Sequence, residues 1–421
     1  MCYTSRMKKS LLFMLCVGMS VSLCAAMKVS WNKITFTDAV SDADVQMGNR
    51  QYRKRLFLPR DLCVVAKGVD ADSLARLVRL YPNVPRFEVR DCPWLTNLEV
   101  LAPLTNLTSL TISLSTLPQN RGRIKPLGVS GLDAFPVLER LALQGMPVLD
   151  LAPVGRCKTL KNLDFSSAQL PDLAPLGGLS GVTNIVFRRS TLSDFAPLAG
   201  LSALASIDFY AAKVPAEKWS SLGALRQVKS FRSGLTSMTS IAWVKELSQI
   251  ESLSLFGEDI RDLSSLVGVK TLKSFTAASM RSSVDVSFAR GCPALKELAL
   301  PCCWVSRLEE LRAASSLRAL DLSEIKNGCD LAFASSLVNL ESLTLDRSNV
   351  QKFDAVKGLP KLRHLSLRDV SSRTAITLKG LEACPQLASL TVSRGAFPNL
   401  EIGDVTHACQ KNVTGFTLIQ K

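Results

Sequence analysis

Residues 138–209 read LERLALQGMPVLDLAPVGRCKTLKNLDFSSAQLPDLAPLGGLSGVTNIVFRRSTLSDFAPLAGLSALASIDF. An L-x-x-L-x-L phrase returns through this stretch, and its central apolar residue, called the anchor below, advances by 22 positions each time. The anchors here are Leu141, Leu163, Ile185 and Ile207. A fixed period of this length is typical of a solenoid, in which each repeat packs only on its neighbours.

A second phrase lies between the anchors. It reads Leu151-Ala-Pro-Val154, then Leu173-Ala-Pro-Leu176, then Phe195-Ala-Pro-Leu198. The L-x-x-L-x-L phrase alternates with period two, which indicates a short strand. The proline phrase cannot join a central ladder, so it must turn back on the opposite side. One coil of strand and return is therefore one repeat.

These phrases resemble the leucine-rich repeat family, and the DLAPL return is similar to that of the short, 22-residue class of bacterial internalin-type proteins. The resemblance implies an α/β fold. This is a curved right-handed coil with a parallel β-sheet on the concave face and short 3-10, helical or irregular returns on the convex face. It also implies a protein-recognition scaffold. The asparagine that many family members carry five residues after the anchor is absent, because residues such as Cys92, Ala168 and Ser190 stand there.

The same pattern continues on both sides of the opening stretch. We expect an N-terminal cap over 27–82, with a helix from Ala71 to Tyr81, and a solenoid of about 15 repeats over 83–421 that includes a C-terminal closing coil. One long step, from Leu110 to Leu141, predicts a surface loop over 117–126. The predicted anchors are Phe87, Leu110, Leu141, Leu163, Ile185, Ile207, Phe231, Leu253, Phe275, Leu298, Leu320, Leu343, Leu365, Leu390 and Phe416.

The first 26 residues have the form of a secretory signal peptide. Lys8 and Lys9 precede an apolar run over 11–23, and small residues follow up to Ala26. We therefore expect an exported protein, whether periplasmic, cell-surface or secreted, that begins near Met27. An uncleaved membrane anchor and a lipid on Cys24 are the alternatives. No apolar run of spanning length follows, so no transmembrane segment is expected in the mature chain.

The chain is basic, with a formal net charge of +15 that falls to +12 without residues 1–26, which carry Arg6, Lys8 and Lys9. A basic surface favours acidic partners. For an exported protein, anionic polymer, anionic lipid or an acidic protein is easier to reach than nucleic acid, which we consider an unlikely partner. A basic surface with no particular ligand explains the same charge. Two segments hold the candidate residues for binding an anionic surface: Arg50, Arg53, Lys54, Arg55, Arg121, Arg123 and Lys125.

The sheet face is the other candidate for binding. Residues one and three positions after each anchor point away from the core, because side chains alternate along a strand. Arginine and aromatic side chains, the types enriched at interface hot spots, gather at these positions in the middle of the chain. The candidate partner-binding residues are Asp164, Arg188, Asp208, Tyr210, Arg232 and Phe256. The first hypothesis is thus a protein-recognition scaffold acting through its concave sheet. The alternative is an envelope or surface protein that adheres to anionic polymer or lipid.

Sequence motifs for chemistry do not occur. The chain has no G-x-S-x-G, no phosphate-binding loop and no H-E-x-x-H, and its two histidines are His364 and His407. We therefore predict no catalytic residue, no metal site, no cofactor and no enzymatic activity. Nine cysteines follow residue 26, and their pairing stays open. Three of them, Cys157, Cys292 and Cys384, each lie six residues before an anchor, which predicts a role in repeat packing.

Overall fold

The computed structural model describes residues 27–30, 33–37, 40, 62–115, 124–372, 378, 380–393 and 415–419. Unit 1 comprises Met1–Ser193 and Gly200–Leu204, and unit 2 comprises Asp194–Ala199 and Ala205–Lys421. The predicted signal peptide over 1–26 lies outside the described residues, as does most of the predicted surface loop. No helix in the described ranges is long and apolar enough to cross a bilayer.

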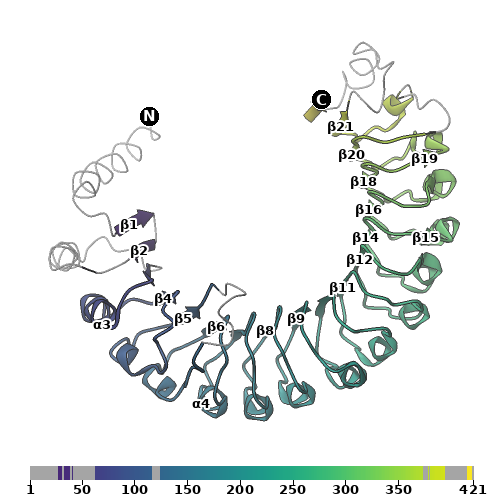
Figure 1. Ribbon diagram of the computed structural model, residues 1–421. Coiled ribbons are helices and arrows are strands. Elements are labelled where there is room, and N and C mark those ends of the chain that lie inside the picture. Colours follow the sequence, from purple (N-terminus) through teal and green to yellow (C-terminus); the bar gives the residue numbers. More distant parts are fainter. Residues whose placement is uncertain are drawn as a thin grey trace, which may run out of the picture. The chain divides into compact units, whose positions relative to one another are not determined.

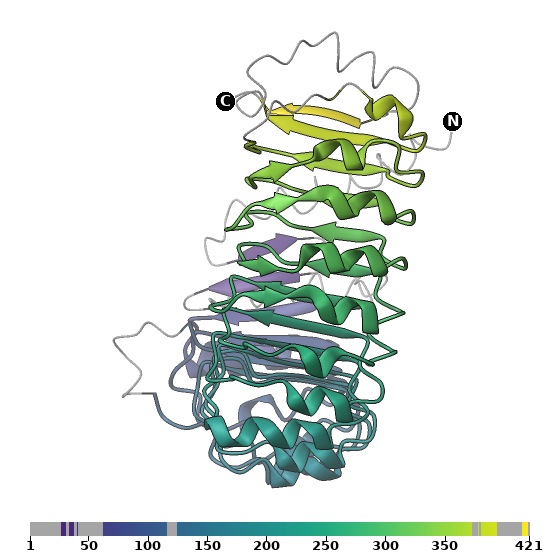
Figure 2. The ribbon, with the colours of Figure 1, turned by 90° about the vertical axis from the view of Figure 1, so that its right-hand side faces the viewer.

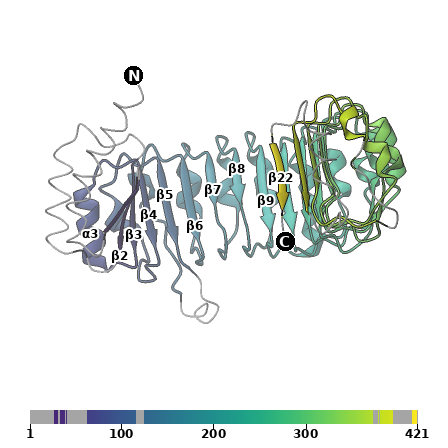
Figure 3. The ribbon, with the colours of Figure 1, turned by 90° about the horizontal axis from the view of Figure 1, so that it is seen from above.

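Unit 1 is a parallel sheet with one strand from each coil. In Figures 1 and 3 its strands lie side by side, with the short helices behind them. The register aligns the predicted anchors from Phe87 to Ile185 in one column. The strands are β1 (Met27–Ser30), β2 (Lys33–Thr37), β3 (Cys63–Lys67), β4 (Arg86–Arg90), β5 (Ser109–Ser113), β6 (Arg140–Gln144), β7 (Asn162–Asp164) and β8 (Asn184–Val186).

Unit 2 repeats this plan, and the register again places the anchors from Ile207 to Phe416 in one column. Figure 2 shows its stacked coils with the helices on the side opposite the sheet. Its strands are β9 (Ser206–Tyr210), β10 (Ser230–Gly234), β11 (Ser252–Phe256), β12 (Ser274–Ala278), β14 (Glu297–Ala299), β16 (Ala319–Asp321), β18 (Ser342–Thr344), β20 (His364–Leu367), β21 (Ser389–Ser393) and β22 (Gly415–Ile419). Two small parallel ladders, β13 (Val284–Asp285) with β15 (Val305–Ser306) and β17 (Cys329–Asp330) with β19 (Val350–Gln351), join neighbouring returns.

The sheet of unit 1 begins earlier than the sequence pattern predicted. Strand β2 pairs in parallel with β3, and β1 folds back on β2 in an antiparallel hairpin. Ile34 and Phe36 of β2 are buried, and Ile34 aligns with Val64 of β3. The predicted cap helix is confirmed as α3 (Ala71–Leu80), with Asp70 as the N-cap that accepts a hydrogen bond from the Ser73 amide. The cap segment therefore supplies paired strands to the sheet.

The returns are mostly 3-10 helices, and an aspartate begins many of them. The Asp172 carboxylate accepts a hydrogen bond from the Ala174 amide at 2.9 Å, and Asp194 does the same for Ala196. This satisfies an amide that a short helix leaves without a partner. It explains why the motif is D-L-A-P-L. The helices are η2 (Glu99–Leu101), η4 (Leu132–Ala134), α4 (Ala152–Arg156), η5 (Ala174–Gly178), η6 (Ala196–Gly200), η7 (Ala216–Ala224), η8 (Ala242–Glu246), η9 (Ser264–Leu266), η10 (Val286–Gly291), η11 (Leu308–Ala313), η12 (Leu331–Ser336), η13 (Phe353–Val356) and η14 (Leu381–Ala383).

Small hydroxyl and thiol groups replace the absent asparagine five residues after the anchor. The hydroxyls of Ser190 and Ser348 and the thiol of Cys303 each donate to a backbone carbonyl of the preceding coil, at 2.5, 2.6 and 3.1 Å. Of the three cysteines with a predicted packing role, Cys292 and Cys384 are buried, whereas Cys157 is partly exposed. All eight cysteines in the described part of the chain are free thiols.

Ion pairs add contacts between neighbouring coils. Examples are Lys161 with Glu139 at 2.5 Å and Lys273 with Glu251 at 2.7 Å. Both pairs are largely exposed, so solvent screening leaves each of them only a small contribution to stability. The stability of each unit therefore depends mainly on the buried anchors, which are at most 2% exposed wherever their burial is described.

Candidate functional site: an arginine against two aromatic rings

Three neighbouring strands of unit 2 build the candidate site. The register aligns Tyr210 of β9, Gly234 of β10 and Phe256 of β11 in one row across the sheet. These residues lie three positions after their anchors, so their side chains project from the sheet face, away from the core. Arg232 lies in the adjacent row, between Asp208 and Ser254.

The Arg232 guanidinium lies against both rings. Its Cζ atom is 5.4 Å from the centroid of the Tyr210 ring and 4.8 Å from that of Phe256. The two rings meet each other edge to face, with centroids 5.9 Å apart. Cation–π contacts of this length stabilise the charge over the rings by roughly 0.5–1 kcal/mol at exposed sites. The side chain of Arg232 is 42% exposed, so part of the guanidinium faces solvent. We call Asp208, Tyr210, Arg232 and Phe256 the Arg232 cluster.

Gly234 makes this contact sterically possible. A Cβ atom at this position would lie 2.7 Å from Cβ of Phe256 and 2.8 Å from Cδ2 of Tyr210. Real Cβ atoms do not approach other carbons this closely, so any side chain here would force the rings apart. A glycine inside a strand is a known sign of such close approach. The sequence contains this glycine three residues after an anchor, but the pattern alone does not show that two rings approach each other there.

Asp208 fixes the base of the cluster. Its carboxylate is nearly buried and accepts a hydrogen bond from the Tyr210 amide at 2.9 Å. The other carboxylate oxygen is 4.0 Å from Nε of Arg232. That nitrogen is buried and, among the described residues, has no hydrogen-bond partner. The arginine is thus held by a loose ion pair and two rings, and it retains hydrogen-bonding capacity for a ligand.

A buried carboxylate supports the turn beside the cluster. Glu258 is fully buried and accepts hydrogen bonds from the hydroxyls of Ser233 and Thr236, both at 2.8 Å. Burial raises the pKa of Glu258, and the hydrogen bonds oppose that rise only in part. Leu235, the first residue after β10, has a left-handed backbone with φ of 53°, and its side chain is 53% exposed. This exposed apolar side chain directly follows β10 and is not among the predicted binding residues.

A shallow hollow follows on the same sheet face of unit 2. Small side chains on β12 to β18, among them Ser274, Thr276 and Ala299, leave a volume of about 180 Å³. Asp321 of β16 also lines it, and Ser342 and Thr344 of β18 lie at its far side. The hollow therefore continues the exposed surface from the Arg232 cluster across the next strands.

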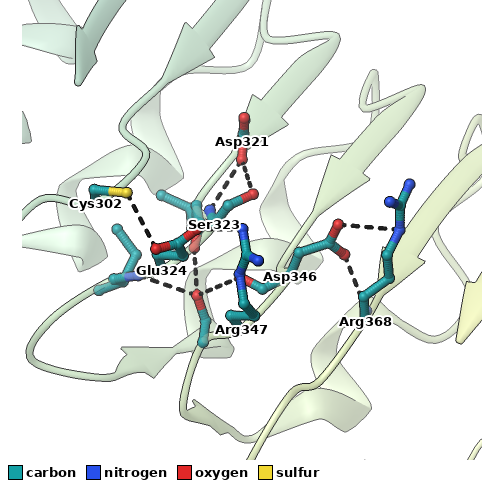
Figure 4. Close-up of polar contacts among 10 residues, drawn as sticks. Cys302, Asp321, Ser323, Glu324, Asp346, Arg347 and Arg368 are labelled. Carbon is teal, nitrogen blue, oxygen red and sulfur yellow. Dashed lines mark hydrogen bonds and ion pairs between the residues drawn. The ribbon is translucent and has the colours of Figure 1, made fainter. Parts of the chain in front are cut away.

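Beyond the hollow, charged side chains pair with one another. Figure 4 shows Arg368 bound to Asp346 and Arg347 bound to Glu324, with the Cys302 thiol 3.3 Å from the Glu324 carboxylate. Burial and this hydrogen bond raise the pKa of Cys302, which makes its thiolate less available. Because each carboxylate already has a partner, this network stabilises neighbouring coils and leaves little free charge for a ligand.

The remaining predicted residues lie elsewhere. Asp164 belongs to unit 1, where its carboxylate accepts hydrogen bonds from the Gln144 amide at 2.7 Å and the Ser166 hydroxyl at 2.6 Å. Arg188 also belongs to unit 1 and is exposed. The structure therefore brings together four of the six predicted partner-binding residues. Of the predicted anionic-surface residues only Lys125 is described, and it is exposed. The others, Arg50, Arg53, Lys54, Arg55, Arg121 and Arg123, lie outside the described residues.

The described ranges contain no group of three or more His, Cys, Asp or Glu side chains that could hold a metal ion. The one histidine within them, His364, is exposed at the sheet surface. The Arg232 cluster combines aromatic area, a cation and a satisfied acid, and arginine and aromatic side chains are the types enriched at interface hot spots.

Solved structures share this fold at low sequence identity. An internalin, InlF of Listeria monocytogenes, is 16% identical with a TM-score of 0.54, over 83% of this chain and 94% of its own. A leucine-rich-repeat protein of Leptospira interrogans is also 16% identical with a TM-score of 0.54, over 82% of this chain and 98% of its own. TLR13, solved as a complex with ssRNA13, is 13% identical with a TM-score of 0.56, over 86% of this chain and 65% of its own.

No family model and no curated protein sequence matches the chain. The register of the coils and the likeness to solved structures nevertheless agree, and the predicted fold class is confirmed. By its fold the chain is a leucine-rich-repeat solenoid with internalins among its structural relatives.

Proposed function

We propose that the protein recognises a protein partner through the sheet face of unit 2, with the Arg232 cluster as the centre of the contact. The observation that carries this proposal is the guanidinium of Arg232 at 5.4 and 4.8 Å from two partly exposed rings. Arginine, tyrosine and other aromatic residues dominate binding energy at interfaces when they cluster near the centre. The rings and the ion pair hold the arginine in place, so little side-chain entropy is lost on binding.

Charge favours a protein over a nucleic acid at this site. At the sheet-facing positions of unit 2, the acids Asp208, Glu297, Asp321 and Asp346 outnumber the bases Arg232 and Arg368. Nucleic acids bind where lysines and arginines neutralise phosphates. The TLR13 complex contains RNA on the same fold, but the acid surplus on this face opposes that mode.

The proposed role is a scaffold that binds without catalysis, in an exported protein. Export is supported by the sequence of residues 1–26, with its basic start, apolar run and small residues before Met27. A binding role is supported by the surface chemistry described above, which provides recognition groups.

Affinity capture from an envelope extract of the source cell tests the proposal. The baits are the mature chain, Arg232→Ala and Phe256→Ala, with Arg290→Ala as the control because Arg290 is an exposed arginine of the return η10. Each cluster variant should weaken the captured complex by about 1 kcal/mol or more, which is roughly fivefold or more. The control should bind as the unaltered chain does. Equal capture by all baits would contradict the proposal.

The second candidate function is adhesion to anionic polymer or lipid through the two basic segments. The observation that favours it is the net charge of +15, together with the exposed Lys125. In that case, changing Arg53, Lys54 and Arg55 to Glu would abolish attachment to envelope material. Attachment of the unaltered chain would also weaken steeply with salt, since exposed charges are screened.

A further inference from the structure

We infer that the sheet face of unit 1 binds an acidic polypeptide segment, so that the partner touches a basic surface on β2 to β8. This inference rests on the proposed function, because it names the chemistry of a second contact with a protein partner. It concerns different residues from the Arg232 cluster, so the two contacts can be tested separately.

The sheet-facing positions of unit 1 carry a surplus of positive charge. These are the positions one before, one after and three after each anchor, as the strand register aligns them. The six basic residues there exceed the two acidic ones by four charges, whereas the corresponding face of unit 2 has two more acids than bases. The basic residues are Lys33, Lys67, Arg86, Arg90, Arg140 and Arg188, and the acidic ones are Glu88 and Asp164.

The two acids are already occupied. Glu88 is shared by Lys33, whose Nζ is 3.0 Å away, and by Arg90 at 2.5 Å. Asp164 accepts its hydrogen bonds from neutral groups. Lys67 and Arg140 are exposed, and in the described part of the chain neither pairs with a carboxylate. Lys67 and Arg140 therefore present positive charge to a ligand from outside.

A polar hollow lies among these charges. It has a volume of about 420 Å³, and the cations Lys67 and Arg90 line it from neighbouring positions on β3 and β4. Its one acid, Asp91, accepts a hydrogen bond from the Ser115 amide at 2.7 Å. The rest of the lining consists largely of hydroxyl and amide groups: Thr111, Ser113, Ser115, Gln144, Ser166 and Ser167. Arg90 already pairs with Glu88, and the Gln144 amide and the Ser166 hydroxyl donate to Asp164. Lys67, at the edge of this polar lining, is the cation suited to a carboxylate side chain from a ligand.

The spacing of the cations suits an extended chain. Lys67 lies on β3 and Arg140 on β6, three strands apart, or roughly 14 Å across the sheet. The register aligns Lys67 with Arg90 and Arg140 with Arg86, four residues away on β4, so the two cations are also about 13 Å apart along the strands. An extended segment of about six residues spans the resulting distance of roughly 19 Å. Acidic residues near the two ends of such a segment would therefore reach Lys67 and Arg140.

Two other anionic ligands fit less well. Within unit 1 the strands form the inner side of the coil, as Figure 1 shows, and a flat bilayer reaches an inner face poorly. The sheet-facing positions of β2 to β8 also hold no aromatic residue, so a sugar ring finds no aromatic surface for stacking. An acidic peptide needs neither feature.

The test uses the full mature chain and a synthetic peptide of alternating glutamate and glycine, labelled for fluorescence anisotropy. The peptide should bind, its affinity should fall as salt rises, and the glutamine counterpart should not bind. Lys67→Gln and Arg140→Gln should each weaken binding about two- to fivefold, as expected for single exposed charge contacts. Lys245→Gln, an exposed lysine of η8, serves as the charge-matched control and should have no effect.

Three results would overturn the inference. They are equal binding of the glutamate and glutamine peptides, an equal loss in the Lys245 control, and binding of polygalacturonate or anionic vesicles in place of the peptide. If capture of the partner depends on Arg232 while the peptide does not bind, only this inference fails. If the peptide binds through Lys67 and Arg140 but Arg232→Ala captures the partner as well as the unaltered chain does, the inference stands and the proposed Arg232 contact fails.

Discussion

Tyr210 and Phe256 meet edge to face although their strands are not neighbours, with ring centroids 5.9 Å apart and an interplanar angle of 74°. The strand between them contributes Gly234, whose missing side chain leaves the space in which the rings approach. Arg232 then lies against both rings. One glycine therefore determines whether the cluster can form.

The first prediction concerns that glycine. Gly234→Ala should lower the free energy of unfolding by about 1–3 kcal/mol, as overpacking commonly does, because the new Cβ would lie 2.7 Å from Phe256 and 2.8 Å from Tyr210. Denaturant unfolding measures this change. The matched control is Gly181→Ala, whose Cβ would meet no atom nearer than 3.5 Å. Similar stabilities of the two variants would show that the rings do not need the space at Gly234.

The second prediction tests the assignment of anchors to the core. Ile185 is fully buried, whereas the next residue, Val186, points to the sheet face and is partly exposed. Ile185→Ala should therefore cost about 2–5 kcal/mol of stability, the usual range for a buried isoleucine. Val186→Ala should cost less than about 1 kcal/mol, because it leaves no internal cavity. Thermal and denaturant unfolding of both variants measures these losses. A larger loss of stability in Val186→Ala than in Ile185→Ala would refute the register.

The third prediction concerns pH. Burial raises the pKa of Glu258 in the folded protein above its value in the unfolded chain, about 4.3. At a pH between the unfolded-state pKa and the folded-state pKa of Glu258, the folded protein binds more protons than the unfolded chain. The contribution of Glu258 to stability is therefore complete below the unfolded-state pKa and is lost as the pH rises through the folded-state pKa. Glu258→Gln removes this loss. The variant should therefore gain stability relative to the unaltered protein as pH rises from about 4 to neutral.

Melting temperatures of both proteins across this pH range provide the measurement. Glu217→Gln, at an exposed position of η7, is the control and should follow the unaltered protein at every pH. A constant difference between Glu258→Gln and the unaltered protein would mean that the pKa of Glu258 is the same in the folded and the unfolded state, which would contradict the prediction.

Much of the fold can be predicted from the sequence because every coil repeats the same pattern of strand and return. The alternating phrase predicts a strand, the proline phrase predicts a return, and the period fixes the register, so the anchors from Phe87 to Ile185 and from Ile207 to Phe416 all lie where the spacing placed them. The pattern does not predict strand β2, because the short Ile34-x-Phe36 alternation does not belong to a phrase that recurs at the repeat period. A pattern search depends on recurrence, and an end coil is atypical.

The candidate site was harder to predict than the fold. Alternation alone placed Tyr210, Arg232 and Phe256 on one face, and the structure brings them together. The pattern could not show that Asp164 is satisfied within its own coil and the one before it, since that depends on the rotamers of Gln144 and Ser166. The pattern placed Glu258 five residues after its anchor, at the position of the absent asparagine, but it gave no sign that a carboxylate there is buried, because burial depends on how two turns pack.

The most direct test of the Arg232 contact is hydroxyl-radical footprinting of the mature chain, free and bound to the partner captured from the envelope extract. The account predicts that Tyr210 and Phe256, which are both partly exposed in the free protein, become protected on binding. Phe231, which is 1% exposed, and Trp304, which is 54% exposed outside the cluster, should change little. Unchanged reactivity of Tyr210 and Phe256 in the bound state would contradict the claim that the partner binds at the Arg232 cluster.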